Sequence, residues 1–154
     1  MTNLKVGGKA PEFNGIDQDG KLISLKDFKD RKLILYFYPK DDTPGCTAEA
    51  CNLRDNYDDL LKKGFAIIGV SADDESSHKK FIAKYVLPFP LITDKDKKII
   101  GMYGAWGEKN LYGKISMGIL RTTFIINKEG VIEKIFTKVD TKNHTQQILE
   151  MKTM

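Results

Sequence analysis

The sequence predicts an α/β protein with a central mixed sheet flanked by helices. Helical and strand-like hydrophobic periods alternate through residues 32–103, and two short strands follow at residues 122–138. Residues 32–38 and 65–71 are apolar at nearly every position, which is typical of strands covered on both faces. The chain of 154 residues contains no internal repeat or linker, so we expect residues 1–154 to form a single domain.

The N-terminal part predicts a β-hairpin. Residues 13–17 and 21–24 are joined at Gln18-Asp19-Gly20, and Asp-Gly supplies the positive φ values that such a turn requires. The next strand, at residues 32–38, ends at Pro39.

Residues 44–63 change to a helical period. Thr43 is placed to cap this helix, Pro44 suits its first turn and Gly64 ends it. Its apolar stripe consists of Ala50, Leu53, Tyr57, Leu60 and Leu61. The spacing therefore predicts one helix over residues 44–63.

The later elements are predicted in the order strand 65–71, helix 76–85, strand 90–93, helix 96–103, strands 122–127 and 131–138, and helix 141–151. Residues 104–118 are punctuated by glycines, and no element is assigned there. A βαβ unit followed by a β-hairpin and a closing helix is the thioredoxin-like plan. The N-terminal hairpin and an inserted βα region are additions to it.

The charge pattern argues against several functions. The net charge is +4, with −3 on residues 1–77 and +7 on residues 78–154, but acidic residues separate the lysines. We therefore expect a solvated surface and no nucleic-acid partner. The apolar runs are far shorter than the roughly 18 residues of a membrane span, so no membrane association is expected. The N-terminus lacks a secretory pattern, which predicts a cytoplasmic protein.

The two cysteines carry the clearest chemical signal. Cys46 follows Thr43-Pro44-Gly45 in the first turn of the long helix, at the carboxyl end of a central strand. Unpaired N–H groups and the positive end of the helix dipole favour a thiolate there. Asp41 and Asp42 oppose this, so a cation from elsewhere in the fold is expected. Cys46 is therefore predicted to be a nucleophile, and a buried apolar role is the alternative.

Residues 38–51 read Tyr-Pro-Lys-Asp-Asp-Thr-Pro-Gly-Cys-Thr-Ala-Glu-Ala-Cys. This segment resembles the active site of the Q-type peroxiredoxins, or bacterioferritin comigratory proteins, whose wider family shares the pattern P-x-x-x-T-x-x-C. The similarity continues in residues 69–71, 105–109 and 121–124, and it extends over nearly the whole chain.

The resemblance implies a thiol-dependent peroxidase that reduces hydrogen peroxide and organic hydroperoxides. Cys46 would attack the terminal peroxide oxygen and become a sulfenic acid. Cys51 would then form an intramolecular disulfide with it, and a thioredoxin-like donor would restore both thiols. No cofactor and no metal are implied.

The resemblance also assigns four supporting residues. Thr43 would hydrogen-bond the peroxide, and Arg121 would supply the missing cation. Pro39 would shield the thiolate, and Glu49 would orient the arginine. Without the resemblance, Thr43 is equally a helix cap, Arg121 a solvated strand end and Glu49 a first-turn acid favoured by the dipole.

Two other functions are possible on the residues alone. The first is a thioredoxin-like disulfide reductase, which relies on the motif C-x-x-C. Here Cys46 and Cys51 are five positions apart, and the Cα atoms of such positions on a helix lie about 8.7 Å from one another, beyond the roughly 7 Å limit for a disulfide. A non-enzymatic metal-binding or redox-sensing module would combine the cysteines with His78 and His144. Their spacing fits no familiar zinc pattern, and both histidines lie in polar segments, so we expect them at the surface.

Overall fold

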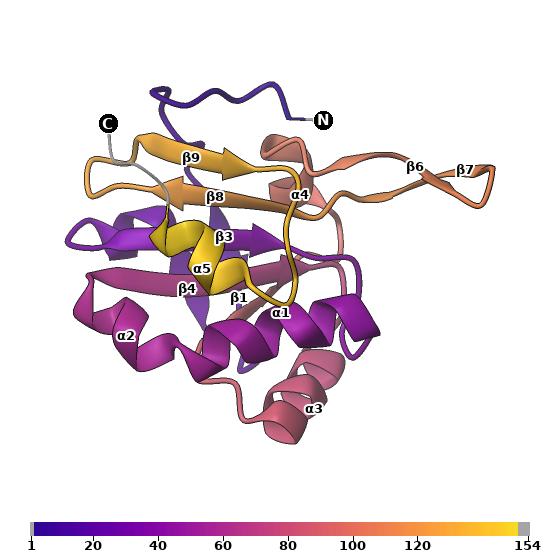
Figure 1. Cartoon of the computed structure of the whole chain (residues 1–154), viewed down its shortest axis with the longest axis horizontal. Coiled ribbons are helices and arrows are strands. Elements are labelled where there is room, and N and C mark those ends of the chain that lie inside the picture. The colour runs from indigo at the N-terminus through magenta and orange to yellow at the C-terminus, as the bar shows by residue number, and fades with distance from the viewer. Residues whose placement is uncertain (1, 151–154) are drawn as a thin grey trace.

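The computed structural model describes residues 2–150 and has a five-stranded mixed sheet at its centre (Figure 1). The strand order is β5-β4-β3-β8-β9. The bounds are β3 Lys32–Phe37, β4 Phe65–Ser71, β5 Leu91–Thr93, β8 Thr122–Ile126 and β9 Ile132–Phe136. Two further two-stranded sheets are formed by β1 Asn14–Ile16 with β2 Leu22–Ser24 and by β6 Trp106–Leu111 with β7 Lys114–Ile119.

Strand β3 is the centre of the sheet. It pairs parallel with β4 and antiparallel with β8, while β5 continues the parallel side and β9 the antiparallel side. The predicted βαβ unit, β-hairpin and closing helix are therefore confirmed. The carboxyl ends of the parallel strands lie at one edge of the sheet, where ligands of such sheets commonly bind.

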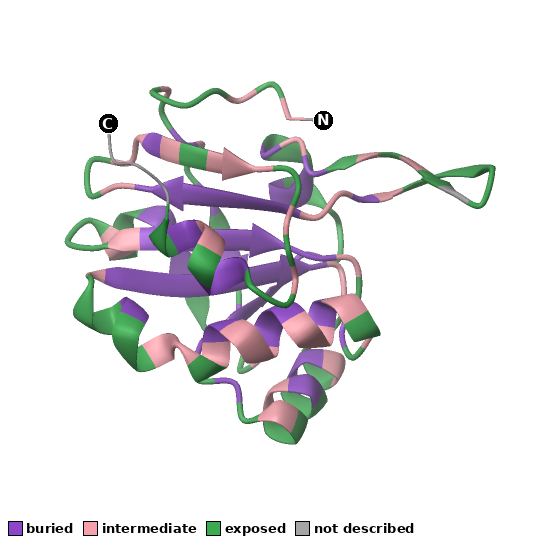
Figure 2. Cartoon of the chain, in the orientation of Figure 1, coloured by how far each residue is buried: buried purple, intermediate pink, exposed green. Residues whose placement is uncertain are grey.

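Strands β3, β4 and β8 are buried on both faces, as the apolar runs predict, whereas the edge strand β9 is partly exposed (Figure 2). The helices are the 3-10 helix η1 Leu25–Phe28, α1 Pro44–Asp55, α2 Tyr57–Lys62, α3 Glu75–Tyr85, α4 Lys98–Met102 and α5 His144–Leu149. Ile34 and Tyr36 of β3 pack in a cluster with residues of α1, α2, α3 and α5. Leu33 and Leu35 point to the other face, where α4, η1 and the N-terminal hairpin cover them. Successive side chains of one strand thus fill two cores.

The helix predicted over residues 44–63 is divided at Asn56. Its φ and ψ of −111° and 12° leave the helical region, and its side-chain Nδ2 donates to the Asn52 carbonyl at 2.8 Å. Asparagine side chains bond to nearby backbone in this way and weaken a helix interior. The apolar stripe continues across the break in Leu53 and Leu60, so hydrophobic periodicity alone predicts one helix.

Asn52 also connects α1 to α5. Its Nδ2 donates to the Lys142 carbonyl at 2.9 Å, and its Oδ1 accepts from the Thr145 backbone N–H at 2.7 Å. The second contact satisfies an N–H at the start of α5 that has no partner within the helix. The later part of α1 is therefore fixed to the closing helix.

Residues 104–118, to which no element is assigned from sequence, form most of the β6–β7 hairpin. It extends away from the central sheet and is largely exposed (Figures 1 and 2). Tyr112 and Gly113 form its turn with φ values of 54° and 80°, as a two-residue hairpin turn requires. Because few of its side chains are buried, the hairpin lacks the apolar alternation by which strands are recognised.

Two predicted helices are shorter in the structure. Helix α4 begins at Lys98 because Lys97 has a φ of 60°, and Asp94 accepts hydrogen bonds from the backbone N–H groups of Ile99 and Ile100. Helix α5 begins at His144, and Met151, the last residue of the predicted helix, lies outside the described residues. Between residues 2 and 150, no helix combines the length and apolarity needed to cross a bilayer.

The packing around Gly69 on β4 generates a stability prediction. A Cβ at this position would lie 2.7 Å from Cδ2 of Leu91 and 2.9 Å from Cζ of Tyr36, so we expect Gly69→Ala to destabilise the fold by about 1–3 kcal/mol. Gly101→Ala on α4 is the control, since no atom lies within 4 Å of its Cβ, and alanine should stabilise the helix by up to about 1 kcal/mol. Urea unfolding measures both, and equal midpoints for the two variants would contradict the tight packing.

Candidate active site

Cys46 lies in the first turn of α1, directly after the loop that leaves β3. Thr43 has extended backbone angles and Pro44 occupies the first helical position, so the helix begins where the sequence predicts. The cysteine is 1% exposed. First-turn N–H groups have no partners within the helix and point toward this end, which favours negative charge on the sulfur.

Arg121 holds the sulfur from the segment between β7 and β8. Its Nη2 donates to Cys46 Sγ at 3.3 Å, and its Nη1 donates to Glu49 Oε1 at 2.8 Å. A Cβ on Gly45 would lie 3.1 Å from Nη2, so glycine before the cysteine leaves room for the guanidinium. The cation that the sequence requires is therefore present.

The pair of Glu49 and Arg121 is largely removed from water. Glu49 is fully buried, and burial raises its pKa from 4.5 to about 7, against the charge and hydrogen bond of Arg121. Burial disfavours the charge of Arg121, but Glu49 and Cys46 together raise its pKa above its ordinary value. The sulfur thus faces a permanent cation. Glu49 Oε2 is buried without a hydrogen-bond partner.

His144, predicted at the surface, is instead fully buried behind Glu49. Its Nε2 lies 2.9 Å from Thr123 Oγ1 and 3.7 Å from Glu49 Oε2, and its ring contacts Phe136 edge-on. Burial lowers the pKa of His144, and the charge of Arg121 acts in the same direction. The surface prediction was wrong because α5 docks on β8 and α1, and no local pattern around residue 144 records that docking.

Thr43 and Pro39 lie on the loop before α1. Thr43 occupies the N-cap position, but its hydroxyl donates to the Lys40 carbonyl at 2.8 Å and does not cap the helix. Pro39 and Arg121 line a cavity of about 470 Å³, together with Lys109 of β6. Burial and the nearby Arg121 charge lower the pKa of Lys109. The cavity therefore lies directly beside the guanidinium that holds the sulfur.

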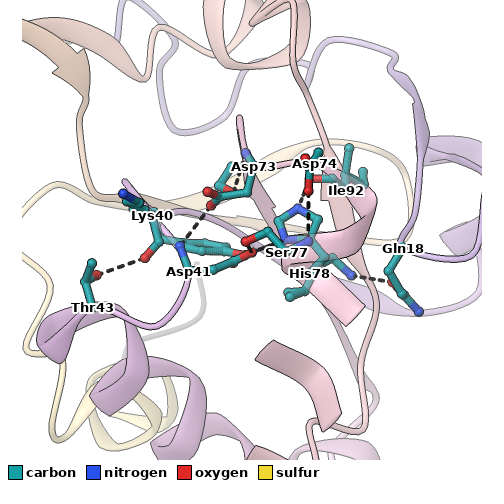
Figure 3. A network of polar contacts seen from close by, with 12 residues as sticks. Gln18, Lys40, Asp41, Thr43, Asp73, Asp74, Ser77, His78 and Ile92 are labelled. Atoms are coloured by element: carbon teal, nitrogen blue, oxygen red, sulfur yellow. Dashed lines mark hydrogen bonds and ion pairs between the residues drawn. The ribbon is translucent and has the colours of Figure 1, made fainter. Parts of the chain in front are cut away.

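A buried polar network fixes this loop (Figure 3). Asp41 accepts from Tyr38 Oη at 2.6 Å and from Ser77 Oγ at 2.8 Å, and its backbone N–H donates to Asp73 at 2.9 Å. His78 Nδ1 lies 2.7 Å from Asp41 Oδ2, and its Nε2 lies 3.0 Å from the Ile92 carbonyl. His78, also predicted at the surface, is thus completely buried because it joins α3, β5 and the loop.

The acids beside Cys46 are compensated. Asp42, with a φ of 56°, accepts from Lys84 and Tyr85, and the Lys84 hydrogen bond is the main reason that its pKa is lowered. Within residues 2–150, the one group of acids, cysteines and histidines spaced closely enough for a metal is Asp41, Asp73 and His78. It contains neither cysteine, so the predicted alternative of a metal module built on both thiols has no support.

Cys51 lies five residues after Cys46 on the same helix, and both thiols are free. Cys46 is buried, whereas Cys51 is half-buried. Helix α1 is continuous between them, which agrees with the expectation that residues five apart on a helix are too far apart for a disulfide.

These features define a class of protein. A mixed sheet with flanking helices places a buried cysteine at a helix start, and an arginine from the segment between β7 and β8 holds its sulfur. This is the arrangement of an enzyme that uses an activated thiol as its nucleophile. A profile of the AhpC/TSA family matches residues 6–135, and the chain belongs to this family.

Relatives of known name and structure are peroxiredoxins. Peroxiredoxin Bcp of Escherichia coli strain K12 is 43% identical over 149 residues, which cover 97% of this chain and 96% of that protein. A Xylella fastidiosa PrxQ cysteine-to-serine mutant superposes with a TM-score of 0.89 at 28% identity, over 97% of this chain and 95% of that one.

A structure described for its insights into alkyl peroxide reduction by the Xanthomonas campestris bacterioferritin comigratory protein has a TM-score of 0.83 at 35% identity. The aligned residues cover 89% of this chain and 87% of that one. The thioredoxin-like fold and the resemblance to Q-type peroxiredoxins are confirmed, and the protein is a thiol-dependent peroxidase.

The raised pKa of Glu49 predicts a pH-dependent stability. Between pH 4.5 and about 7 the folded protein keeps a proton that the unfolded chain has released, so stability falls as the pH rises through this window. The variant Glu49→Gln does not titrate at this position. Relative to it, the free energy of unfolding of the wild type should decrease by up to about 3 kcal/mol between these limits. Urea unfolding of both reduced proteins at several pH values measures the difference. If the difference in free energy of unfolding between the two proteins does not change with pH, Glu49 is already ionised in the folded protein throughout this pH window.

Proposed function

We propose that Cys46 is the peroxidatic cysteine of this enzyme. Its thiolate attacks the terminal oxygen of a hydroperoxide, the O–O bond breaks, and the departing oxygen takes a proton from solvent and leaves as water or an alcohol. The sulfur is left as a sulfenic acid. The observation that carries the proposal is the 3.3 Å contact between Arg121 Nη2 and the buried sulfur, because it places a fixed cation where charge develops.

The other residues of the site support this step. Arg121 holds the thiolate and the peroxide oxygens, and Glu49 holds the arginine through its 2.8 Å hydrogen bond. Thr43 turns its hydroxyl from the Lys40 carbonyl to the bound peroxide, since this hydroxyl is not used as a helix cap. Pro39 contributes an apolar wall to the cavity beside Arg121.

Cys51 completes the cycle. Its thiolate attacks the sulfenic sulfur of Cys46, an intramolecular disulfide forms, and the sulfenic hydroxyl takes a proton from solvent and leaves as water. The first turns of α1 have to unwind for this step, because both cysteines lie on one continuous helix. A thioredoxin-like dithiol then supplies two electrons and restores both thiols.

The substrates are hydrogen peroxide and organic hydroperoxides, and the alkyl peroxide reduction named for the Xanthomonas campestris relative supports the second class. We place the enzyme in the cytoplasm, where reducing systems keep a cysteine pair of this kind in the thiol state. We treat residues 1–154 as one peroxiredoxin domain without a nucleic-acid or membrane partner.

The roles of the two cysteines are separated by two serine variants. Cys46→Ser should abolish turnover to below a few per cent of wild type, because a serine hydroxyl is not ionised at neutral pH. Cys51→Ser should still react once with peroxide, but its sulfenic acid should persist until a thiol caps it or excess peroxide oxidises it further. Stopped-flow mixing followed by mass spectrometry checks both. Multiple turnovers by Cys46→Ser with a protein donor would contradict the assignment.

Arg121→Ala should slow the reaction of the reduced enzyme with hydrogen peroxide by a factor of about 10² or more, since one fixed donor at developing charge commonly contributes this much. Lysine should restore only part of the rate, because it cannot hold two oxygens with a planar fork. Arg31→Ala, at an exposed arginine on the loop before β3, is the matched control. A wild-type rate in Arg121→Ala would remove Arg121 from the reaction.

A further inference from the structure

The hydrogen bonds around His144 determine where one of its protons lies. Gln147 Nε2 donates to the Lys138 carbonyl at 3.1 Å, and its Oε1 accepts from the Asp140 backbone N–H at 2.9 Å, so the orientation of the amide is fixed by two backbone groups. The same Oε1 lies 2.8 Å from His144 Nδ1. Because an amide oxygen only accepts, Nδ1 carries a proton.

The opposite nitrogen faces an unsatisfied carboxyl oxygen. His144 Nε2 lies 3.7 Å from Glu49 Oε2, and that oxygen is buried without a hydrogen-bond partner. In a neutral imidazole with a protonated Nδ1, Nε2 presents only a lone pair. This lone pair can accept a hydrogen bond from the Thr123 hydroxyl, whose Oγ1 lies 2.9 Å away. A carboxylate and a neutral imidazole would therefore face each other lone pair to lone pair in a dry interior. One added proton, on either group, removes this conflict.

Charged and titratable groups face the pair from several segments. Arg121 binds the other oxygen of Glu49, and Cys46 lies on the far side of that guanidinium. Tyr36 of β3 is buried, and its pKa is raised well above the ordinary value, first by burial and then by the charge of Glu49. Asp140, which precedes α5, raises the pKa of His144, but this effect is weaker than the lowering by burial. Arg121 is thus the cation that the pair and the thiolate share.

We propose that His144 is a positioning residue for the peroxidase reaction: the Glu49–His144 pair holds one proton, on Glu49 Oε2 or on His144 Nε2, and this proton keeps Glu49 from competing with the Cys46 thiolate for Arg121. With this proton bound, Glu49 and His144 together carry no net charge, and the guanidinium is balanced by the thiolate alone. Without it, two buried anions compete for one cation, and the oxygen that leaves the peroxide is less well stabilised. The burial that raises the pKa of Glu49 to about 7 is consistent with this proton.

The inference rests on the proposed role of Cys46, and the pH dependence of sulfenic acid formation tests it. The rate should fall at least about threefold when the proton on the Glu49–His144 pair is lost, at a pH between about 6 and 9. Glu49→Gln should remove the alkaline fall, because an amide accepts from Arg121 through one atom and donates to His144 through the other. His144→Phe, which keeps a ring against Phe136, should move the fall to lower pH.

A double-mutant cycle separates positioning from packing. If His144 acts through Glu49, then His144→Phe should change the pH profile in the wild-type background and leave it unchanged in the Glu49→Gln background. Gln146→Ala, an exposed position on α5, is the control and should keep the wild-type profile. Equal changes in both backgrounds would show that the histidine is only a packing residue and would overturn the proposal.

A measurement on the unmodified protein covers the case in which the histidine variant does not fold. In the reduced wild type, the nuclear magnetic resonance signals of His144 Nε2 and the Glu49 carboxyl carbon should titrate together with one midpoint. Separate midpoints, or normal peroxide reactivity without an alkaline fall, would overturn the proposal of one proton on the Glu49–His144 pair and leave the peroxidase assignment intact. A wild type that does not react with peroxide would refute the proposed function. In that case, the titration of the two nuclear magnetic resonance signals would still show whether Glu49 and His144 bind one proton as a pair.

Discussion

The guanidinium of Arg121 is the constraint on which the site depends. It is a cation largely removed from water, and such a charge is tolerated only with partners of good geometry. Cys46 and Glu49 are these partners, at 3.3 Å and 2.8 Å. Both lie in the first turns of α1, whereas the arginine enters from the other half of the chain. The position of α1 against β8 is therefore set by a charge balance as well as by apolar packing.

Much of the fold follows from local pattern. The strands at residues 32–37 and 65–71 are recognisable because nearly every side chain is apolar, and the starts of α1 and α3 are marked by threonine, proline and aspartate. The break at Asn56 does not follow, since it depends on one side-chain hydrogen bond that leaves the apolar stripe intact. Nor does the β6–β7 hairpin, whose strands pair by backbone hydrogen bonds with little burial of side chains.

The site divides in a similar way. Cys46 is predictable from its place at a helix start, because the helix dipole acts locally. Arg121 and Glu49 needed the family resemblance, since an arginine before a strand and an acid on a helix have ordinary explanations. His78 and His144 were wrongly predicted at the surface. Their neighbours in sequence are polar, and only the packing of α3 and α5 against remote segments buries them. A buried polar residue in a polar segment leaves no periodic signal.

The side chains of α1 that bond to other segments also divide this helix into parts of unequal independence. Asn52 is joined to the Lys142 carbonyl and to the start of α5, so the residues that follow it open only if the closing helix also detaches. The turns before Asn52 contain both cysteines, and Arg121 joins them to another segment through its contacts with Cys46 and Glu49. Local unfolding that breaks these contacts can therefore be confined to one cooperative unit at the N-terminal end. The chain can rearrange its thiols while the sheet and the closing helix keep their register.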